Sequence, residues 1–521
     1  MDSPFLDRLH SNYIPSDDEI KVIQTAILAR SRDLERINET IRSLTAERDK
    51  IQDYIDAHKA LLSYARRLPH DIVQAIFTAC LPHDRNAVMS REEAPLLLCE
   101  ICGVWRNLAL NTPRLWASLH VPVEFLSGNV SRMRFLSQWL DRSGVTPLSL
   151  SVSNGLGFSY GFELLDAVNL LVGYSGRWRH LELLDFSAEA LSVLAGVDAP
   201  TLASIKISVT PGWQNIQMNM LQEQTLRSVC FQWFGINDNI LDAPVAWHQL
   251  TQLSITHFDV GYHEWEGLLS LHHAFMLLQR CHRLISFEFG PTAEDCPELP
   301  GPVTLPLLRS LVMCKPSRLQ TVSIERLLQN LRLPELRTLH IHVPTFAPSA
   351  TTFLADIGRQ SSLIHDLRID LSAFNKELLL DALGYIPSLT KLHITDSDSW
   401  GALADESPID APQLLQLLTP DPGFHLSIVC PLLQELTVLQ CSPVSEDILF
   451  AFLQNRIDLE TDFRALKIFF QREEASKHDV ERFRERGLKI QFKFPQLRKS
   501  LPTPWYGLWP KDSDDAFAQW D

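Results

Sequence analysis

The chain has 521 residues, of which 45% are hydrophobic and 21% are charged, as in ordinary folded proteins. This composition excludes a chain that is disordered throughout, and it excludes collagen-like and disulfide-framework classes. The net charge of −16 argues against a general binder of nucleic acid or of anionic membranes, because both need basic surface. We therefore expect about three domains, or one long repeat array with additions.

The expected location is the cytoplasm, the nucleus or both. The nine cysteines are scattered and odd in number, which favours free thiols in a reducing compartment. No apolar run reaches the roughly 18 residues of a membrane-spanning helix. The first residues lack the basic and apolar pattern of a secretory signal. We expect neither membrane nor nucleic acid among the partners.

Residues 16–67 are predicted to form one long heptad helix. Ser16 and Glu19 have the spacing of a capping box, and no Pro or Gly occurs between Asp17 and Arg67. Two rows at heptad spacing are mostly aliphatic, which is typical of a coiled coil. We expect a homodimer through this helix or a rigid arm; the alternatives are a helix folded back on the chain's own core and a single amphipathic helix. The rows are Ile20, Ile27, Leu34, Ile41, Arg48, Ile55 and Leu62, and Ile23, Arg30, Ile37, Leu44, Ile51 and His58.

Residues 68–121 are predicted to form a small helical domain. Leu68 and Pro69 are expected to end the long helix and to begin a new one with a single apolar face. Residues 83–93 are polar and predict a loop, and a second helix is expected to begin near Pro95. So small a unit cannot bury all of its apolar side chains, which suggests a partner.

Here the sequence resembles a known family, the F-box proteins. Residues 68–77 (LPHDIVQAIF) are similar to the opening of an F-box, and residues 98–109 (LCEICGVWRNLA) to its second half. Residues 111–119 (NTPRLWASL) match an extension found in a large fungal F-box-like family. The resemblance covers about 55 residues. The long segment from Pro82 to Glu93 and the glycine at Gly103 depart from the F-box pattern.

The resemblance implies that this domain binds the Skp-type adaptor of an SCF ubiquitin ligase and, through it, the cullin. The alternative is a plain helical cap for the array that follows, without adaptor binding. The positions of the motif that would contact the adaptor are Leu68, Pro69, Ile72, Ile76, Phe77, Leu98 and Trp105.

Residues 145–495 are predicted to be an irregular leucine-rich-repeat array. Each repeat has a central apolar residue, a second apolar residue three positions before it and a third two positions after it. This pattern recurs mostly every 24–34 residues. Such repeats form a solenoid in which parallel strands line one face and helices the other, and which presents a large surface for a protein target. The overall prediction is an α/β fold. The central residues are Leu181, Ile205, Val229, Leu253, Phe287, Leu311, Leu339, Leu367, Leu392, Leu436 and Leu466.

Several segments are less regular. Residues 256–282, 290–304 and 396–430 interrupt the spacing, either as binding inserts or as solvated loops. A last helix is expected over 476–486 and a last strand over 488–494. The tail, 500–521, is aromatic and acidic, and it either docks on the array or is disordered.

No constellation for catalysis stands out. Cys99 and Cys102 form the only Cys-x-x-Cys pair and lack a second pair at metal spacing, and no phosphate-binding glycine loop or nucleophile elbow is present. We expect no enzyme activity, no cofactor and no metal site. The favoured hypothesis is the substrate-recognition subunit of an SCF-type ligase with an unknown protein substrate. The alternative is a leucine-rich-repeat scaffold outside any ligase.

Overall fold

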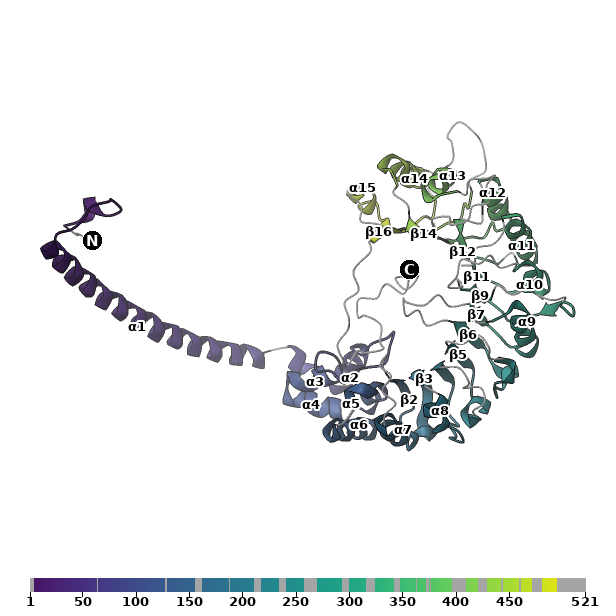
Figure 1. Ribbon diagram of the computed structural model, residues 1–521, viewed down its shortest axis with the longest axis horizontal. Coiled ribbons are helices and arrows are strands. Elements are labelled where there is room, and N and C mark those ends of the chain that lie inside the picture. The colour runs from purple at the N-terminus through teal and green to yellow at the C-terminus, as the bar shows by residue number, and fades with distance from the viewer. Residues whose placement is uncertain are drawn as a thin grey trace. The chain divides into compact units, whose positions relative to one another are not determined.

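The computed structural model shows a long N-terminal helix followed by one long, all-parallel α/β sheet (Figure 1). The chain divides into two units, Met1–Ile76 and Phe77–Asp521. The predicted α/β class is confirmed. The structure describes residues 4–62, 64–126, 129–154, 162–186, 188–209, 217–233, 240–256, 269–292, 299–314, 324–341, 347–361, 363–371, 374, 376–395, 409–419, 429–441, 444–458, 461–470 and 480–493.

The long heptad helix is α1 (Asp17–Leu61), and none of its residues is buried. The predicted cap is present, because the Ser16 backbone N–H donates to the Glu19 carboxylate over 2.9 Å. The helix ends at Leu61, seven residues before Leu68. Its last turn tightens, with the Leu62 N–H bonded to the Lys59 carbonyl, and a 3-10 turn, η2 (Tyr64–Arg67), follows.

Three short helices follow: α2 (His70–Ala79), α3 (Leu96–Ile101) and α4 (Gly103–Leu110). The expectation of one helix from Pro95 onward is wrong, since Cys102 is extended, with φ −160° and ψ 166°. The Cys102 thiol sulfur accepts the Trp105 N–H over 3.5 Å. Cys102 therefore caps α4 and separates it from α3.

Fourteen parallel strands form the main sheet in chain order, except that β8 (Val303–Thr304) and β10 (Leu331–Arg332) pair separately. The order is β1 (Ser118–Pro122), β2 (Leu148–Ser153), β3 (Trp178–Phe186), β4 (Ser204–Val209), β5 (Ser228–Trp233), β6 (Gln252–Thr256), β7 (Ser286–Phe289), β9 (Ser310–Met313), β11 (Thr338–Ile341), β12 (Asp366–Asp370), β13 (Lys391–Thr395), β14 (Glu435–Cys441), β15 (Ala465–Phe470) and β16 (Lys489–Lys493).

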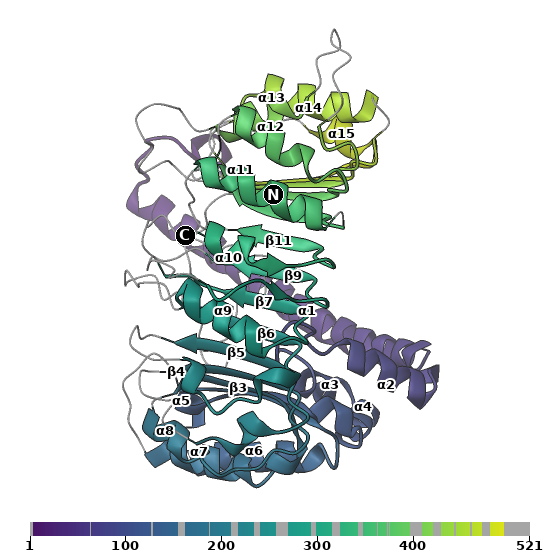
Figure 2. The same ribbon diagram turned by 90° about the vertical axis from the view of Figure 1, so that its right-hand side faces the viewer.

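Helices cover one face of this sheet and leave the strands on the inner side of an arc (Figures 1 and 2). Among the described residues between β4 and β6, the helical segments are short 3-10 turns, such as Trp247–Gln249. The helices are α5 (Val123–Leu126), α6 (Val130–Arg142), α7 (Phe162–Val172), α8 (Ala188–Ser192), α9 (Leu271–Arg280), α10 (Glu325–Gln329), α11 (Ala347–Gln360), α12 (Lys376–Gly384), α13 (Ala411–Leu417), α14 (Glu446–Asp458) and α15 (Glu481–Arg484).

The register confirms the predicted repeats. All eleven predicted central residues pair with one another across neighbouring strands, and each is nearly or fully buried. The row continues through Leu119 and Leu150 at its start and through Ile490 at its end. Alternate strand residues point to opposite faces of the sheet, so all members of this row lie on the same face. They form the centre of the hydrophobic core.

The loop predicted over residues 83–93 is present, since these residues form neither helix nor strand, and it packs against the start of the sheet. The Ala87 carbonyl accepts the His120 N–H of β1 over 2.7 Å, and Ala87 and Val88 are fully buried. The Arg85 guanidinium and the Glu93 carboxylate form a bidentate ion pair, with N–O distances of 2.6 and 3.2 Å. The segment therefore covers the edge strand, which would otherwise present unpaired backbone groups.

The irregular segments are described only in part. Helix α9 occupies the end of the interval 256–282, β8 lies in 290–304, and α13 lies in 396–430. The last predicted strand is present as β16, and α15 lies within the last predicted helix. Residues 257–268, 293–298, 396–408, 420–428, 471–479 and the predicted tail 500–521 lie outside the described residues.

Candidate functional site

Helix α2 carries apolar side chains of two kinds. Val73 and Phe77 are buried, at 3% and 0% exposure, whereas Ile72 and Ile76 are 46% and 42% exposed. Ile72 and Ile76 are four residues apart and so lie on the same helix face. Leu68, just before the helix, is 36% exposed, and Pro69 is exposed as well.

Two of the predicted contact residues lie inside the protein. Phe77 is fully buried, and its ring meets the Trp105 ring edge to face, with centroids 5.0 Å apart. Leu98 on α3 is 4% exposed, and Trp105 on α4 is half-buried. Phe77 and Leu98 therefore pack in the interior of the helical unit. Of these three side chains, only that of Trp105 is partly exposed.

Three exposed side chains on α3 and α4 were not predicted as contact residues. Leu97, Ile101 and Val104 are 42%, 53% and 62% exposed. The signal that indicates Leu97 and Ile101 is their spacing of four residues within one helix. These two helices thus present an apolar surface of their own.

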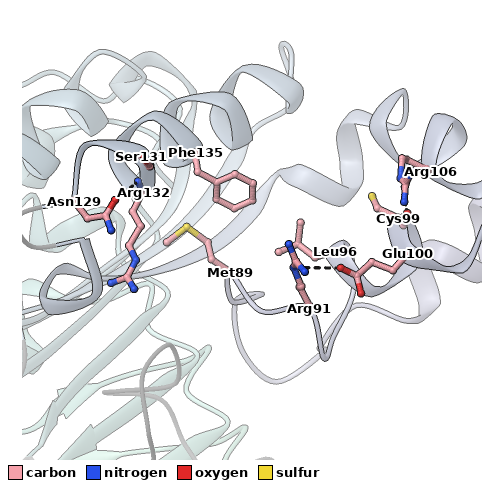
Figure 3. A pocket seen from close by; sticks show the side chains of 10 residues that line it. All are labelled: Met89, Arg91, Leu96, Cys99, Glu100, Arg106, Asn129, Ser131, Arg132 and Phe135. Atoms are coloured by element: carbon pink, nitrogen blue, oxygen red, sulfur yellow. Dashed lines mark hydrogen bonds and ion pairs between the residues drawn. The ribbon is translucent and has the colours of Figure 1, made fainter. Parts of the chain in front are cut away.

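A pocket of about 450 Å³ lies beside these helices (Figure 3). Figure 3 shows Leu96, Cys99 and Glu100 of α3 on one side and Asn129, Ser131, Arg132 and Phe135 on the other. The Arg91 guanidinium pairs with the Glu100 carboxylate over 3.2 Å, and Arg106 donates to the Cys99 carbonyl over 2.8 Å.

The pocket does not have the chemistry of a cysteine active site. Burial raises the pKa of the Cys99 thiol, so the thiol stays protonated at neutral pH and is a poor nucleophile. No histidine lines the pocket among the described residues. The Cys99-x-x-Cys102 pair is also split between two elements, since Cys102 is extended at the break after α3.

The inner face of the array carries a histidine–carboxylate cluster on β11, β12 and β13. The Nε2 atoms of His340 and His393 lie 3.0 and 3.5 Å from the Asp366 Oδ1 atom. Burial acts to raise the pKa of the Asp366 carboxyl, but the His340 hydrogen bond and the two histidines bring it below its usual value. Burial lowers the pKa of His393 to about 4, so this ring is neutral at neutral pH.

This cluster serves to bind three strands together. Within the part of the chain that the structure describes, no group of three or more His, Cys, Asp or Glu side chains is placed to hold a metal ion. A second polar group, on β6 and β7, is similar in kind: the Ser254 hydroxyl donates to the Glu288 carboxylate over 2.9 Å. The neighbouring Cys314 thiol donates to Glu288 as well, and burial raises the pKa of this thiol well above its usual value.

One edge of the array is basic. The residues just before successive strands form a ladder, in which the Arg337 N–H donates to the Arg309 carbonyl and the His365 N–H to the Arg337 carbonyl. We call Arg283, Arg309, Arg337 and His365 the basic edge, and all four are exposed. Arg309, Arg337 and His365 each lie one residue before the adjacent strands β9, β11 and β12, and Arg283 lies three residues before the neighbouring strand β7.

The basic edge is little neutralised. Among the described residues, the single ion pair of these four side chains joins Arg337 to Glu335, at 3.9 Å and with both side chains 45% exposed. No Asp or Glu occupies this ladder position in any of the eleven predicted repeats. An edge about four strands, or roughly 15 Å, long therefore carries positive charge on an acidic protein.

Two comparisons set the chain against known proteins. No protein-family model matches it, and a search of the curated proteins finds no match. Among the helices described, none combines the length and the apolar character needed to span a membrane.

Proposed function

We propose that this chain is the substrate-recognition subunit of an SCF-type ubiquitin ligase. In this proposal α2, α3 and α4 bind a Skp-type adaptor, which joins the chain to a cullin, and the repeats hold a target protein. The chain itself performs no chemistry. Its work is to bring a target close to the ubiquitin-loaded enzyme, which raises the local concentration of one reactant around the other.

The single observation that supports this proposal best is the exposure of Ile72 and Ile76. A helix that only capped the array would be expected to bury its apolar side chains. Instead α2 buries Val73 and Phe77 and leaves Ile72 and Ile76 more than 40% exposed. An exposed aliphatic pair at helical spacing is typical of a surface that a partner helix covers.

The apolar side chains of α3 and α4 support the same proposal. Leu97, Ile101 and Val104 are all more than 40% exposed within fifteen residues of one another. The rings of Phe77 and Trp105 pack edge to face within the same helical unit. We propose that the adaptor covers these side chains as well as Ile72 and Ile76.

For the target, we propose contact with the basic edge. Exposed guanidinium groups bind carboxylates and phosphates through paired hydrogen bonds, so this edge suits an acidic segment of a protein. The overall charge of −16 disfavours a polyanion as long as nucleic acid, because binding that polymer needs many basic contacts.

The adaptor proposal is tested by co-expression of the full chain with a Skp-type adaptor and size-exclusion chromatography. We expect co-elution with the wild-type chain and its loss with Ile72→Lys/Ile76→Lys. Leu307→Lys/Leu432→Lys is the matched control, because it introduces the same charges at exposed leucines of the array. A folded wild-type chain that never co-elutes would contradict the proposal and favour the scaffold alternative.

A further inference from the structure

Helix α1 carries a long aliphatic stripe on its surface. Ten of the thirteen positions of the two heptad rows are Ile or Leu, and none of the 45 residues of α1 is buried. A lone helix gains nothing from a row of aliphatic side chains in water, because their burial is what stabilises such helices in proteins. The exposed members are Ile20 (37%), Ile27 (59%), Leu34 (59%), Ile37 (52%), Ile41 (55%), Leu44 (59%), Ile51 (54%), Ile55 (39%) and Leu62 (68%).

We propose that a second copy of this chain covers the stripe, with the two α1 helices parallel and in register. A repeat of 3.5 residues sustained over six heptads keeps the stripe facing a partner helix along the whole length. Two such stripes would bury on the order of 1,500 Å² together, which is the size of a stable interface. The inference uses α1 alone and does not rest on the proposed function.

The flanking rows favour a partner of identical sequence. Each member of the first heptad row, which begins at Ile20, is directly preceded by a flanking residue. In a parallel pair this flanking residue faces the residue that lies five positions later in the sequence of the other helix. Asp33 then faces Asn38 of the partner subunit, and Glu47 faces Gln52 of the partner subunit. No like charges meet in any of these pairs, which are Glu19–Gln24, Ala26–Ser31, Asp33–Asn38, Thr40–Thr45, Glu47–Gln52 and Tyr54–Lys59.

The same rows disfavour the antiparallel arrangement. With the two helices fully overlapped and antiparallel, Asp33 would face Glu47 of the partner subunit, and this repulsion would occur twice. Arg30 and Arg48 interrupt the two aliphatic rows, which we call the seam, and they do not discriminate between the two orientations. In the parallel pair each arginine faces the same arginine of the partner subunit. In the antiparallel pair Arg30 faces Arg48 of the partner subunit. Each has an acid of its own chain beside it, Asp33 at 3.3 Å and Asp49 at 2.5 Å.

The first test is the mass of the full chain in solution by light scattering at micromolar concentration. We expect twice 59.3 kDa for the wild type and 59.3 kDa for Ile37→Lys/Leu44→Lys. Val22→Lys/Leu28→Lys is the matched control, because these exposed aliphatic residues lie on α1 outside both heptad rows. A monomeric wild-type chain, or a dimer that survives the seam variant, would overturn the proposal.

The second test separates the two orientations. Two differently tagged full-length chains, one Ile23→Cys and the other Ile55→Cys, are mixed, dissociated, reassociated and oxidised. In the parallel pair each cysteine meets its own counterpart, so each tag forms disulfides only with itself. In the antiparallel pair Ile23 faces Ile55, so only the mixed disulfide forms and the parallel proposal falls. The oxidised wild type reports the background from the exposed Cys80 and Cys102.

Discussion

Asp185 is a partly buried acid in a conformation that few side chains adopt. It lies near the end of β3 with φ +61°, at a point where the pairing of β3 with β4 shifts register. Asp and Asn tolerate this left-handed conformation better than other residues with side chains. Burial raises the pKa of its carboxyl from 3.8 to about 6. The ionised form therefore costs the folded state free energy at neutral pH.

We predict that Asp185→Asn stabilises the chain in a pH-dependent way. Because the folded pKa lies above the unfolded one, the wild type loses stability as the pH rises from 3.8 to 6 and stays at that lower level above pH 6. The gain from the uncharged amide should be about 2 kcal/mol at pH 7.5 and should shrink as the pH falls below 6. Urea unfolding at several pH values measures it, with the exposed Asp462→Asn as control. An equal gain at every pH would contradict this origin.

Arg456 is a buried cation whose partners are backbone carbonyls. The side chain is on α14 and is 1% exposed. Its guanidinium donates to the carbonyls of Leu418, Val429 and Cys430 over 3.1, 3.2 and 3.3 Å. Leu418 is the C-terminal cap of α13, so the charge also faces the negative end of that helix. The Cys430 carbonyl also accepts the Leu433 N–H over 3.1 Å, so the Arg456 side chain matters most for the carbonyls of Leu418 and Val429.

We predict that Arg456→Met lowers the free energy of unfolding by about 3 kcal/mol, because it removes the guanidinium donor from all three carbonyls. The loss should be concentrated locally, so amide hydrogen exchange in α13 and α14 should speed up before that in β2 and β3 changes. Arg464→Met, at an exposed arginine of the same repeats, is the control and should have almost no effect. Uniform loss of protection across the array would argue against a local role.

The segment 82–93 shows why a polar stretch is hard to interpret from sequence. The loop predicted over 83–93 is present, but the composition gives no sign that Asn86 to Met89 are buried against the start of the sheet. The Glu93 carboxylate accepts the Val88 N–H over 2.8 Å in addition to its pair with Arg85. The contact of the Ala87 carbonyl with the His120 N–H joins residues 33 positions apart along the chain, which local pattern does not encode. The helix break at Cys102 was missed for a related reason, since extended Cys carries no strong local signal.

We predict that Glu93→Gln lowers stability by about 3 kcal/mol, because it leaves Arg85 as an unpaired charge that is 7% exposed. A double variant, Arg85→Gln/Glu93→Gln, should recover part of this loss, since no buried charge remains in it. Thermal unfolding of the three chains measures both effects. If the double variant is less stable than Glu93→Gln alone, the unpaired charge is not the source of the loss.

Replacing the seam arginines of α1 is expected to stabilise the protein, whereas the substitutions of Arg456 and Glu93 are expected to destabilise it. In the proposed dimer Arg30 and Arg48 occupy positions that aliphatic side chains would fill. Arg30→Ile/Arg48→Ile should therefore strengthen association by tenfold or more and raise the melting temperature of the helix. Sedimentation equilibrium and circular dichroism measure these two quantities. Arg32→Ile/Arg36→Ile, which removes the same charge outside both rows, is the control, and an equal gain there would contradict a specific seam.

The array was predictable because its signal repeats. Each predicted centre rests on three apolar residues, and eleven such triplets agree with one register. The row also contains Leu150 and Ile490, which the pattern missed because Pro147 and Gly487 occupy the first apolar position of their triplets. The candidate adaptor surface was harder. Phe77 and Leu98 belong to the motif as much as Ile72 does, and only packing decides which of them is buried.

The basic edge is a property of the whole array, because residues from strands as much as 80 positions apart in sequence build it. Arg309, Arg337 and His365 occupy consecutive rungs of the backbone ladder, about 5 Å apart. Each alone would be an ordinary surface charge, worth less than about 1 kcal/mol in an exposed pair. In a row they can act together on one extended acidic segment. Salt should weaken that contact, because exposed charges are screened.

We predict that Arg309→Glu/Arg337→Glu weakens binding of a fluorescein-labelled peptide of alternating glutamate and glycine by about tenfold, given up to about 1 kcal/mol for each exposed pair. Removing the competing acid with Glu335→Gln should tighten binding, since Arg337 then faces the peptide without a rival. Fluorescence anisotropy at low and high salt measures both effects. Arg359→Glu/Lys376→Glu changes the net charge equally on α11 and α12 and should leave binding nearly unchanged. If this control weakens binding as much as the edge variant does, peptide binding depends on the overall charge of the protein and not on the basic edge.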